Sequence, residues 1–201
     1  MNMHNLFPTP VGFFDLDREF TKAELDFLLN QDTRPNMGNT TSVDNYICRS
    51  AKLKKLTQFF NDSLHEYFTT VHSPKHKVAP RITQSWINYT QPGEFHHKHA
   101  HPNSFISGVF YIQTDETKDK IYFYKDNYQQ FELVPNDWNE WNSKSWWFEA
   151  LPGRLILFPS SLTHMVEHVQ AEQTRVSVSF NTFLYGSLGE ANDLTELTIE
   201  E

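Results

Sequence analysis

The spacing of apolar residues along the chain predicts two helices near the N-terminus. The first begins with a capping-box spacing and continues as one apolar stripe, formed by Thr21, Glu24, Leu25, Leu28 and Leu29. Apolar residues that recur every three or four positions predict a longer helix from about Ser50 to about Val71. The segment between them, residues 31–46, is polar and is expected to be a loop. We interpret both helices as support for a sheet.

From about residue 80 the apolar period changes to two, which is typical of strands. Strands are predicted over residues 82–89, 105–112, 121–124, 154–158 and 175–183. Residues 6–16 should be an extended entry segment, and their prolines suit the edge of a sheet. Residues 125–150 have no regular pattern, and the acidic residues 186–201 are expected to form a loose tail. The order of elements predicts an α+β protein, mainly β, whose β part is a sandwich or barrel.

Length and composition limit the possible classes of protein. A chain of 201 residues with 38% hydrophobic and 21% charged residues fits one globular domain. We divide this single domain, residues 1–201, into N-terminal helical support (1–79), a β core (80–185) and the acidic tail (186–201). The net charge of −8 argues against nucleic acid or an anionic membrane as a partner.

The chain also carries few signs of export. Cys48 is the single cysteine, so an internal disulfide is impossible and a reducing compartment fits. No apolar run approaches the roughly 18 residues of a membrane span, and the N-terminus lacks the pattern of a signal peptide. We therefore expect a cytoplasmic protein.

Four of the ten histidines lie between residues 96 and 102. Neutral imidazole is the commonest metal ligand among side chains. In an extended strand His97, His99 and His101 would form one row, with His96 facing the other way. Such a row needs a partner from elsewhere, and the best candidate is His164. One histidine would favour a solvated polar turn, but four this close favour a metal site.

The predicted strand over residues 175–183 has one polar and one apolar face. The polar face carries Arg175, Ser177, Ser179 and Asn181. This face could turn to water, as in an ordinary half-buried strand, or it could line a cavity. In a cavity, Arg175 could hold a carboxylate with two parallel hydrogen bonds and Ser177 could add a third. His164 and Arg175 are eleven positions apart, so a tight turn would bring them to the same end of a barrel.

Several segments together resemble the iron(II)- and 2-oxoglutarate-dependent oxygenases, in particular small bacterial and marine phage members related to prolyl 4-hydroxylases. The matching segments, in chain order, are 6–11, 86–88, 92–93, 99–102, 107–112, 153–160 with His164, and the Arg-x-Ser element 175–177. The resemblance extends from residue 6 to about 183 and is thin over 31–75 and 113–150. Each motif alone is weak, but their order and spacing together are fairly specific.

The resemblance implies a double-stranded β-helix, the jelly-roll architecture shared with cupins. It implies iron(II) held by His99, a group two residues later and His164, with ascorbate as a further reductant. 2-Oxoglutarate would chelate the iron, and its far carboxylate would pair with Arg175 and Ser177. Further hydrogen bonds to the cosubstrate would come from two residues, Asn88 and Tyr111. Oxygen would then hydroxylate a substrate, with release of succinate and carbon dioxide.

The sequence departs from the family pattern at one ligand. The usual site has two histidines and one carboxylate, but the carboxylate position here holds His101. Glu94 lies five residues before His99 and could reach the metal only through an unusual turn. Three neutral ligands would leave the site about one unit of charge more positive than the usual site with its carboxylate. We predict His99, His101 and His164 as ligands; the alternative is His99 and His164 alone, with water or His97 completing the site.

Three functions remain open. The first is a 2-oxoglutarate-dependent hydroxylase acting on a peptide, an amino acid, a sugar or another small metabolite, in the host cytoplasm if the chain is phage-encoded. The second is a cupin-like three-histidine enzyme that does not use 2-oxoglutarate and would not need Arg175. The third is a non-catalytic metal-binding module. The tryptophan-rich residues 138–147 form either a hydrophobic cluster under a long loop or a lid over the substrate.

Overall fold

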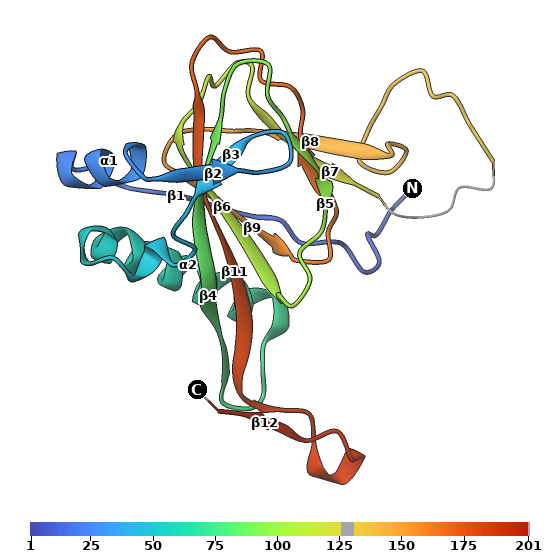
Figure 1. Ribbon diagram of the computed structural model, residues 1–201. Helices are drawn as coiled ribbons and strands as arrows, with labels where there is room; N and C mark the ends of the chain where they lie inside the picture. The colour runs from blue at the N-terminus through green and yellow to red at the C-terminus, as the bar shows by residue number, and fades with distance from the viewer. Residues whose placement is uncertain (126–130, 201) are drawn as a thin grey trace.

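The computed structural model describes residues 1–125 and 131–200. Two antiparallel sheets face each other in this part of the chain (Figure 1). The strands of the larger sheet, in spatial order, are β1 (Gly12–Asp15), β9 (Arg154–Pro159), β6 (Ile106–Gln113), β11 (Arg175–Leu188), β4 (Val78–Thr90), β3 (Thr40–Ser42) and β2 (Thr33–Pro35), with β12 (Leu197–Ile199) beside β11. Those of the smaller sheet are β5 (His96–His99), β10 (His164–Val166), β7 (Lys120–Tyr124) and β8 (Ser145–Glu149). Two facing antiparallel sheets give the double-stranded β-helix that was predicted.

The two predicted helices are present and support the larger sheet. In α1 (Lys22–Leu29) the Thr21 side chain accepts from the Glu24 backbone N–H, and the Glu24 carboxylate accepts from the Thr21 N–H, which completes the capping box. Two 3-10 turns, η1 (Ile47–Arg49) and η2 (Ala51–Leu53), precede α2 (Lys54–His72). Figure 1 shows both helices on one side of the larger sheet and β5, β7 and β8 on the other.

The larger sheet has an apolar outer face and an inner face that is partly apolar and partly polar. Its outer face packs against α2 through Phe60, Phe110, Phe180 and their neighbours, and an added Cβ at Gly108 would lie 2.2 Å from the Phe180 ring. A second apolar cluster, which includes Tyr111 and Phe123, lies between the two sheets. The remaining inner face of β11 carries the polar row that starts at Arg175; Arg175, Ser177 and Ser179 are buried, and Asn181 at its end is half-buried.

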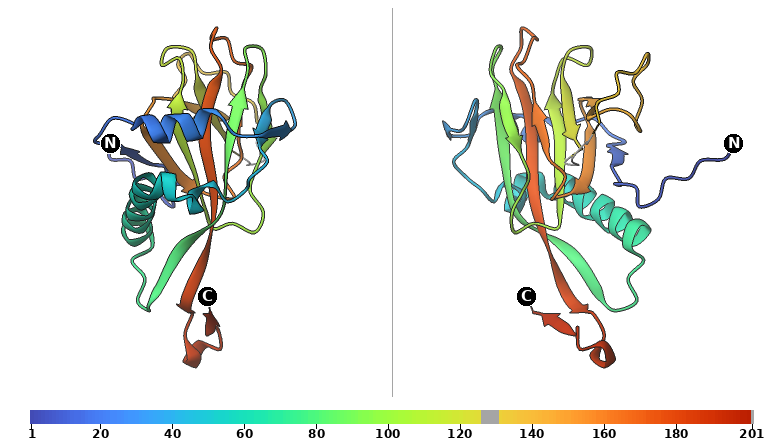
Figure 2. Two further views of the ribbon diagram at one scale, coloured as in Figure 1. Left: turned by 60° about the vertical axis from the view of Figure 1, so that its left-hand side comes forward. Right: turned by 90° about the vertical axis from the view of Figure 1, so that its right-hand side faces the viewer.

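Three stretches expected to be irregular contain strands. Residues 31–46 form the β2–β3 hairpin, because the turn closes with a hydrogen bond from Asn36 N to Asn39 O and Gly38 adopts a positive φ of 92°. β8 forms within residues 125–150 by pairing with β7, and residues 126–130 of that stretch lie outside the described residues. The tail contains η3 (Ala191–Asp193) and β12, which pairs with the end of β11 (Figure 2).

Within residues 1–125 and 131–200, no helix is long and apolar enough to span a bilayer.

Candidate metal centre and cosubstrate pocket

Three histidines from two elements converge between the sheets. β10 pairs with β5 so that His164 lies directly opposite His99. His101 follows β5, and its backbone N–H donates to Ser160 O, which fixes the turn beside β9. The candidate ligand atoms of His99, His101 and His164 all lie within 4.8 Å of one another, and the two Nε2 atoms of His99 and His101 are 3.1 Å apart.

Each of the three rings has its Nδ1 atom bonded to an oxygen. The acceptors are His97 O for His99 (2.7 Å), Asn181 Oδ1 for His101 (2.5 Å) and Leu162 O for His164 (3.0 Å). Since these oxygens only accept, each Nδ1 carries the proton and each Nε2 presents a lone pair. Lone pairs of His99 and His101 that face each other at 3.1 Å repel unless a cation lies between them. The donor set therefore fits a metal ion held through three Nε2 atoms.

Burial keeps these imidazoles neutral. It lowers the pKa of His99 to about 4 and that of His164 to about 3, and it also lowers the pKa of His101. The neighbouring imidazoles add to the effect, because two positive charges this close repel. A metal can thus bind near neutral pH without displacing protons from these side chains.

His96 lies on the side of the strand where the sequence predicted it would not. Its ring stacks on that of His99 with centroids 4.6 Å apart. The expected alternation fails because the β5–β10 ladder has a register shift: Val166 pairs with His96 and His164 with His99, so three residues of β5 span two of β10. His96, His97 and His99 form a second group with ligand atoms within 4.8 Å, and the buried Nδ1 of His97 has no hydrogen-bond partner among the described residues.

Other candidate ligands lie elsewhere. The Glu94 carboxylate accepts from the Gln91 N–H and closes the turn before β5. His168 packs against Phe95, with ring centroids 4.9 Å apart. Neither group of candidate ligands in the described ranges contains a carboxylate. Both groups therefore offer imidazole nitrogens alone as candidate metal ligands.

A small cavity joins the histidines to the polar face of β11. We call it the inner cavity; its walls include His99, His101, His164, Asn88, Arg175 and Ser177. Apolar side chains of β6, β7 and β9 close the other side, among them Val109, Ile121 and Phe158. The polar face of β11 thus lines a cavity, which was one of the two interpretations of its sequence.

Arg175 is a buried cation without an acidic partner. The side chain is 3% exposed, and its guanidinium donates to Lys120 O at 3.0 Å and to the Tyr111 hydroxyl at 3.4 Å. No carboxylate in the described part of the chain forms a salt bridge with it. A buried charge with only neutral partners is costly, so the inner cavity is suited to an anion.

The other two predicted cosubstrate residues lie level with Ser177. Asn88 and Tyr111 are paired with Ser177 across β4, β11 and β6. Asn88 Nδ2 donates to Ser179 Oγ at 2.9 Å, whereas Tyr111 contacts Arg175 through its hydroxyl and its ring. Burial raises the pKa of Tyr111 to about 12, so its hydroxyl stays protonated and can donate. Tyr111 therefore orients the guanidinium, and Asn88 lines the cavity.

Two further residues of the site, Asn181 and Trp86, were not predicted from the sequence to hold a ligand. Asn181 was placed on the polar face of β11, and it holds the His101 ring. Trp86 lies beside His101, with ring centroids 5.9 Å apart, and its indole N–H donates to Asn88 Oδ1 at 3.2 Å. The alternation of β11 put Asn181 on the correct face, but its distance to His101 depends on a turn between other strands.

Comparisons with known proteins agree with this geometry. Residues 84–181 match the family model described as "Putative 2OG-Fe(II) oxygenase". Similar solved structures include a 2OG-Fe(II) oxygenase family oxidoreductase from Burkholderia pseudomallei, with 13% identity, TM-score 0.58, and 86% of this chain and 83% of that chain covered. HygX from Streptomyces hygroscopicus, solved with nickel and 2-oxoglutarate bound, has 12% identity and a TM-score of 0.60 over 87% and 82% of the two chains.

A third similar structure is a prolyl-4-hydroxylase from Pseudomonas putida, with 13% identity, a TM-score of 0.53, and 86% of this chain and 92% of that chain covered. A search of curated proteins found no match. The chain thus has a double-stranded β-helix fold with a candidate metal centre of three histidines. The match of residues 84–181 to this family model and the shared fold agree with the predicted resemblance to the iron(II)- and 2-oxoglutarate-dependent oxygenases. The description of the matched family names the predicted cofactor, iron(II), and the predicted cosubstrate, 2-oxoglutarate.

The predicted ligand His101, which replaces a carboxylate, gives one prediction about iron(II) binding. His101→Ala should weaken iron(II) binding, because it removes one of three converging Nε2 atoms. His97→Ala should not, because the His97 side chain is not among these three ligands and its backbone oxygen, which holds the His99 ring, is kept. Metal analysis of the two purified variants after equilibration with limiting iron(II) checks this. Full iron content in His101→Ala would mean that two histidines suffice.

The lowered pKa values give a second prediction. In the unfolded chain these histidines have a pKa near 6.5. In the folded protein the pKa is about 4 for His99 and about 3 for His164, so the unfolded state binds more protons when the pH lies between these values and 6.5. The free energy of unfolding of the metal-free protein should thus keep the whole contribution of these histidines above about pH 6.5, and it should fall as the pH drops toward 3. Thermal melts from pH 8 to 4 measure this.

The matched control for the pH prediction is His65, which is exposed on α2. His65→Ala should leave the slope of stability against pH unchanged, and His164→Ala should make it shallower. Equal slopes in both variants would contradict the account of the buried imidazoles.

Proposed function

We propose that the protein is a hydroxylase in which His99, His101 and His164 hold iron(II), while Arg175 and Ser177 hold the far carboxylate of 2-oxoglutarate. The observation that carries this proposal is the buried Arg175 without an acidic partner, in the same cavity as the three Nε2 atoms. A dianionic cosubstrate that reaches from the metal to Arg175 would supply the missing negative charge.

The chain's own residues would mainly bind and orient. Hydrogen bonds from the three Nδ1 atoms fix the rings, so that the Nε2 lone pairs point to one place. Arg175 is itself held by Lys120 O and by Tyr111, and can present two parallel N–H groups to a carboxylate. Ile121, Phe158 and their apolar neighbours would keep water out of the inner cavity. Bound iron, with 2-oxoglutarate and oxygen, supplies the oxidising power that hydroxylates a C–H bond.

Three neutral ligands would change the electrostatics of the centre. With His101 in place of a carboxylate, the metal keeps its full positive charge and should attract the dianionic cosubstrate more strongly. The cupin-like alternative, an enzyme without 2-oxoglutarate, gives Arg175 no role. The burial of this cation without an acid therefore favours the oxygenase over that alternative.

We also propose the organisation and location of the enzyme. Residues 1–201 form one domain, in which residues 1–79 support the β core of 80–185. A cytoplasmic location, in a bacterium or in the host of a phage, fits the single buried thiol of Cys48.

The test is turnover of the cosubstrate by the purified protein. With iron(II), oxygen and 2-oxoglutarate, we expect slow formation of succinate even without the substrate, and none when iron is withheld or when His99 is replaced in His99→Ala. Succinate is measured by chromatography against a protein-free control. Equal succinate with and without iron, or none under any condition, would contradict the proposal.

A further inference from the structure

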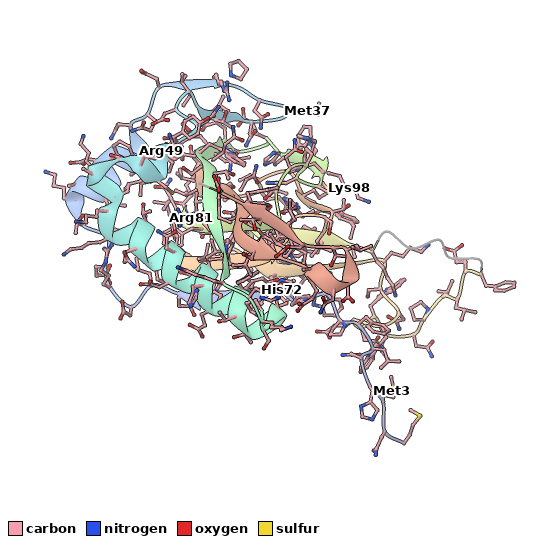
Figure 3. All side chains as sticks on the ribbon, turned by 90° about the horizontal axis from the view of Figure 1, so that it is seen from below. Met3, Met37, Arg49, His72, Arg81 and Lys98 are labelled. Carbon is pink, nitrogen blue, oxygen red and sulfur yellow. The ribbon has the colours of Figure 1, made fainter. Side chains whose placement is uncertain are left out.

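A second, wider cavity opens on the other side of the histidines. We call it the outer cleft; it has a volume of about 540 Å³ and shares Trp86, His96, His99 and His101 with the inner cavity. Its far wall is the β2–β3 hairpin, whose turn contacts the start of β5 through a hydrogen bond from Phe95 N to Gly38 O. Figure 3 shows Met37 in this turn on the same side of the molecule as Lys98 of β5. The outer cleft thus reaches the candidate metal centre from outside.

The outer cleft has many amide groups on its walls. Five amide side chains line it: Asn36, Asn45, Gln84, Asn103 and Asn181. Ligand sites are mostly apolar with a few polar groups, so this lining calls for a ligand with many hydrogen-bonding groups. Gln84 and Asn103 have no side-chain hydrogen bond within the described ranges, so both are available to a ligand. An apolar ligand would leave these groups unpaired and would bind poorly.

The outer cleft also has one aromatic wall. Trp86 is half-buried, and its indole is fixed by the hydrogen bond to Asn88 and by contact with His101. A rigid indole offers a flat, electron-rich face to the C–H groups of a ring-shaped ligand at little cost in side-chain entropy. Amides beside a fixed indole suit a hydroxylated ring, which has polar edges and less polar faces.

The described residues that line the outer cleft include a positively charged side chain and no negatively charged one. Arg34 lies on its wall and donates to Asn45 Oδ1 at 3.0 Å, a neutral partner that leaves the positive charge in place. No aspartate or glutamate is among the residues that line this cleft in the described part of the chain. A cationic ligand would therefore meet no opposite charge, whereas a carboxylate or phosphate could pair with Arg34.

We propose that the substrate of the outer cleft is an acidic sugar or a similar polyhydroxylated ring that carries one carboxylate or phosphate group. This inference rests on the proposed function, since it takes the cleft beside the iron site as the substrate site. The ring lies against Trp86, its hydroxyl groups bond to the amides, and its acidic group pairs with Arg34. A C–H bond of the ring then faces His99 and His101, where the hydroxylation would occur.

Four sugars of similar size and different charge test this proposal: glucuronate, glucose 6-phosphate, glucose and glucosamine. Their affinities are measured by ligand-observed NMR with the full chain, both metal-free and loaded anaerobically with iron(II) and 2-oxoglutarate. We expect at least one acid to bind roughly tenfold more tightly than glucosamine, with glucose between them. The two acids distinguish a carboxylate from a phosphate as the preferred group.

Substitutions of Arg34 test whether the preference for an acidic sugar arises in the outer cleft. Arg34→Gln should remove the preference for the acid, and Arg34→Lys should keep part of it. The matched control is Arg49→Gln, which makes the same change in net charge at an exposed side chain that lies over Tyr46 and outside this cleft. The preference for an acid in either form of the protein, lost in Arg34→Gln and kept in Arg49→Gln, supports the proposal.

Three results would overturn it: undetectable binding of both acids, glucosamine binding as tightly as the acids, or an unchanged preference in Arg34→Gln. A failure of the proposed function can be distinguished from these three results. In that case 2-oxoglutarate would fail to bind or turn over, while the metal-free protein could still prefer the acidic sugars.

Discussion

His164→Ala is expected to lose nearly all binding of iron(II). His164 is 7% exposed and lies opposite His99 in the β5–β10 ladder, where it supplies the one ligand from the second strand. Changes to groups that merely support a metal ligand cost about 10–100-fold in affinity, so loss of a ligand itself should cost at least about 100-fold. Metal analysis after equilibration with stoichiometric iron(II) gives the measurement.

The matched control for His164 is the next histidine of the same segment. His168 packs against Phe95 and is exposed, so His168→Ala should retain the iron content of the unaltered protein. Circular dichroism and thermal melts verify that both variants fold. Equal loss of iron in the two variants, or no loss in either, would show that the wrong histidine was assigned.

Arg175→Ala is expected to retain iron and to lose affinity for 2-oxoglutarate. The pair between its buried guanidinium and a carboxylate would be charge-assisted, and removal of one partner of such a pair costs about 2–5 kcal/mol, or roughly thirtyfold or more in affinity. The substitution removes a buried cation that has no acidic partner in the described ranges, so it should not destabilise the fold through a broken salt bridge. Titration of the anaerobic iron(II) protein with 2-oxoglutarate measures the loss.

Two milder variants test the same interaction with the carboxylate of 2-oxoglutarate. Arg175→Lys should recover only part of the affinity, because an ammonium group cannot reproduce the two parallel hydrogen bonds of guanidinium. Ser177→Ala should lose about 1–3 kcal/mol, the cost of one hydrogen bond to a charged group. If Arg175→Ala binds 2-oxoglutarate as tightly as the unaltered protein, Arg175 is not the carboxylate partner.

Much of the fold could be predicted because its signals are local. The capping box at Thr21 and Glu24 fixes the start of α1 through bonds between residues three positions apart. The alternation in β11 put Arg175 and Ser177 on one face, and their burial shows that this face is internal. The proline-containing entry segment forms β1 at the edge of the larger sheet.

The remaining features depend on contacts between distant residues. His96 faces the centre because of a register shift against β10, which lies about seventy positions further along the chain. The β2–β3 hairpin is ordered by its pairing with β4, where Thr40 lies opposite Tyr89. The polar composition of residues 31–46 indicated a loop and contained no sign of this partner. The residues of the outer cleft come from four separate parts of the chain, 34–45, 83–86, 96–103 and Asn181, and only the fold brings Arg34 near Asn181.

The central claim is that one cavity holds iron on three histidines and 2-oxoglutarate between that iron and Arg175. The most direct test is the visible spectrum of the anaerobic iron(II) protein during addition of 2-oxoglutarate. We expect the weak charge-transfer band of a keto acid chelated to iron(II), saturating with added 2-oxoglutarate and absent in His164→Ala. A protein that binds iron but develops no band at saturating 2-oxoglutarate would contradict the claim.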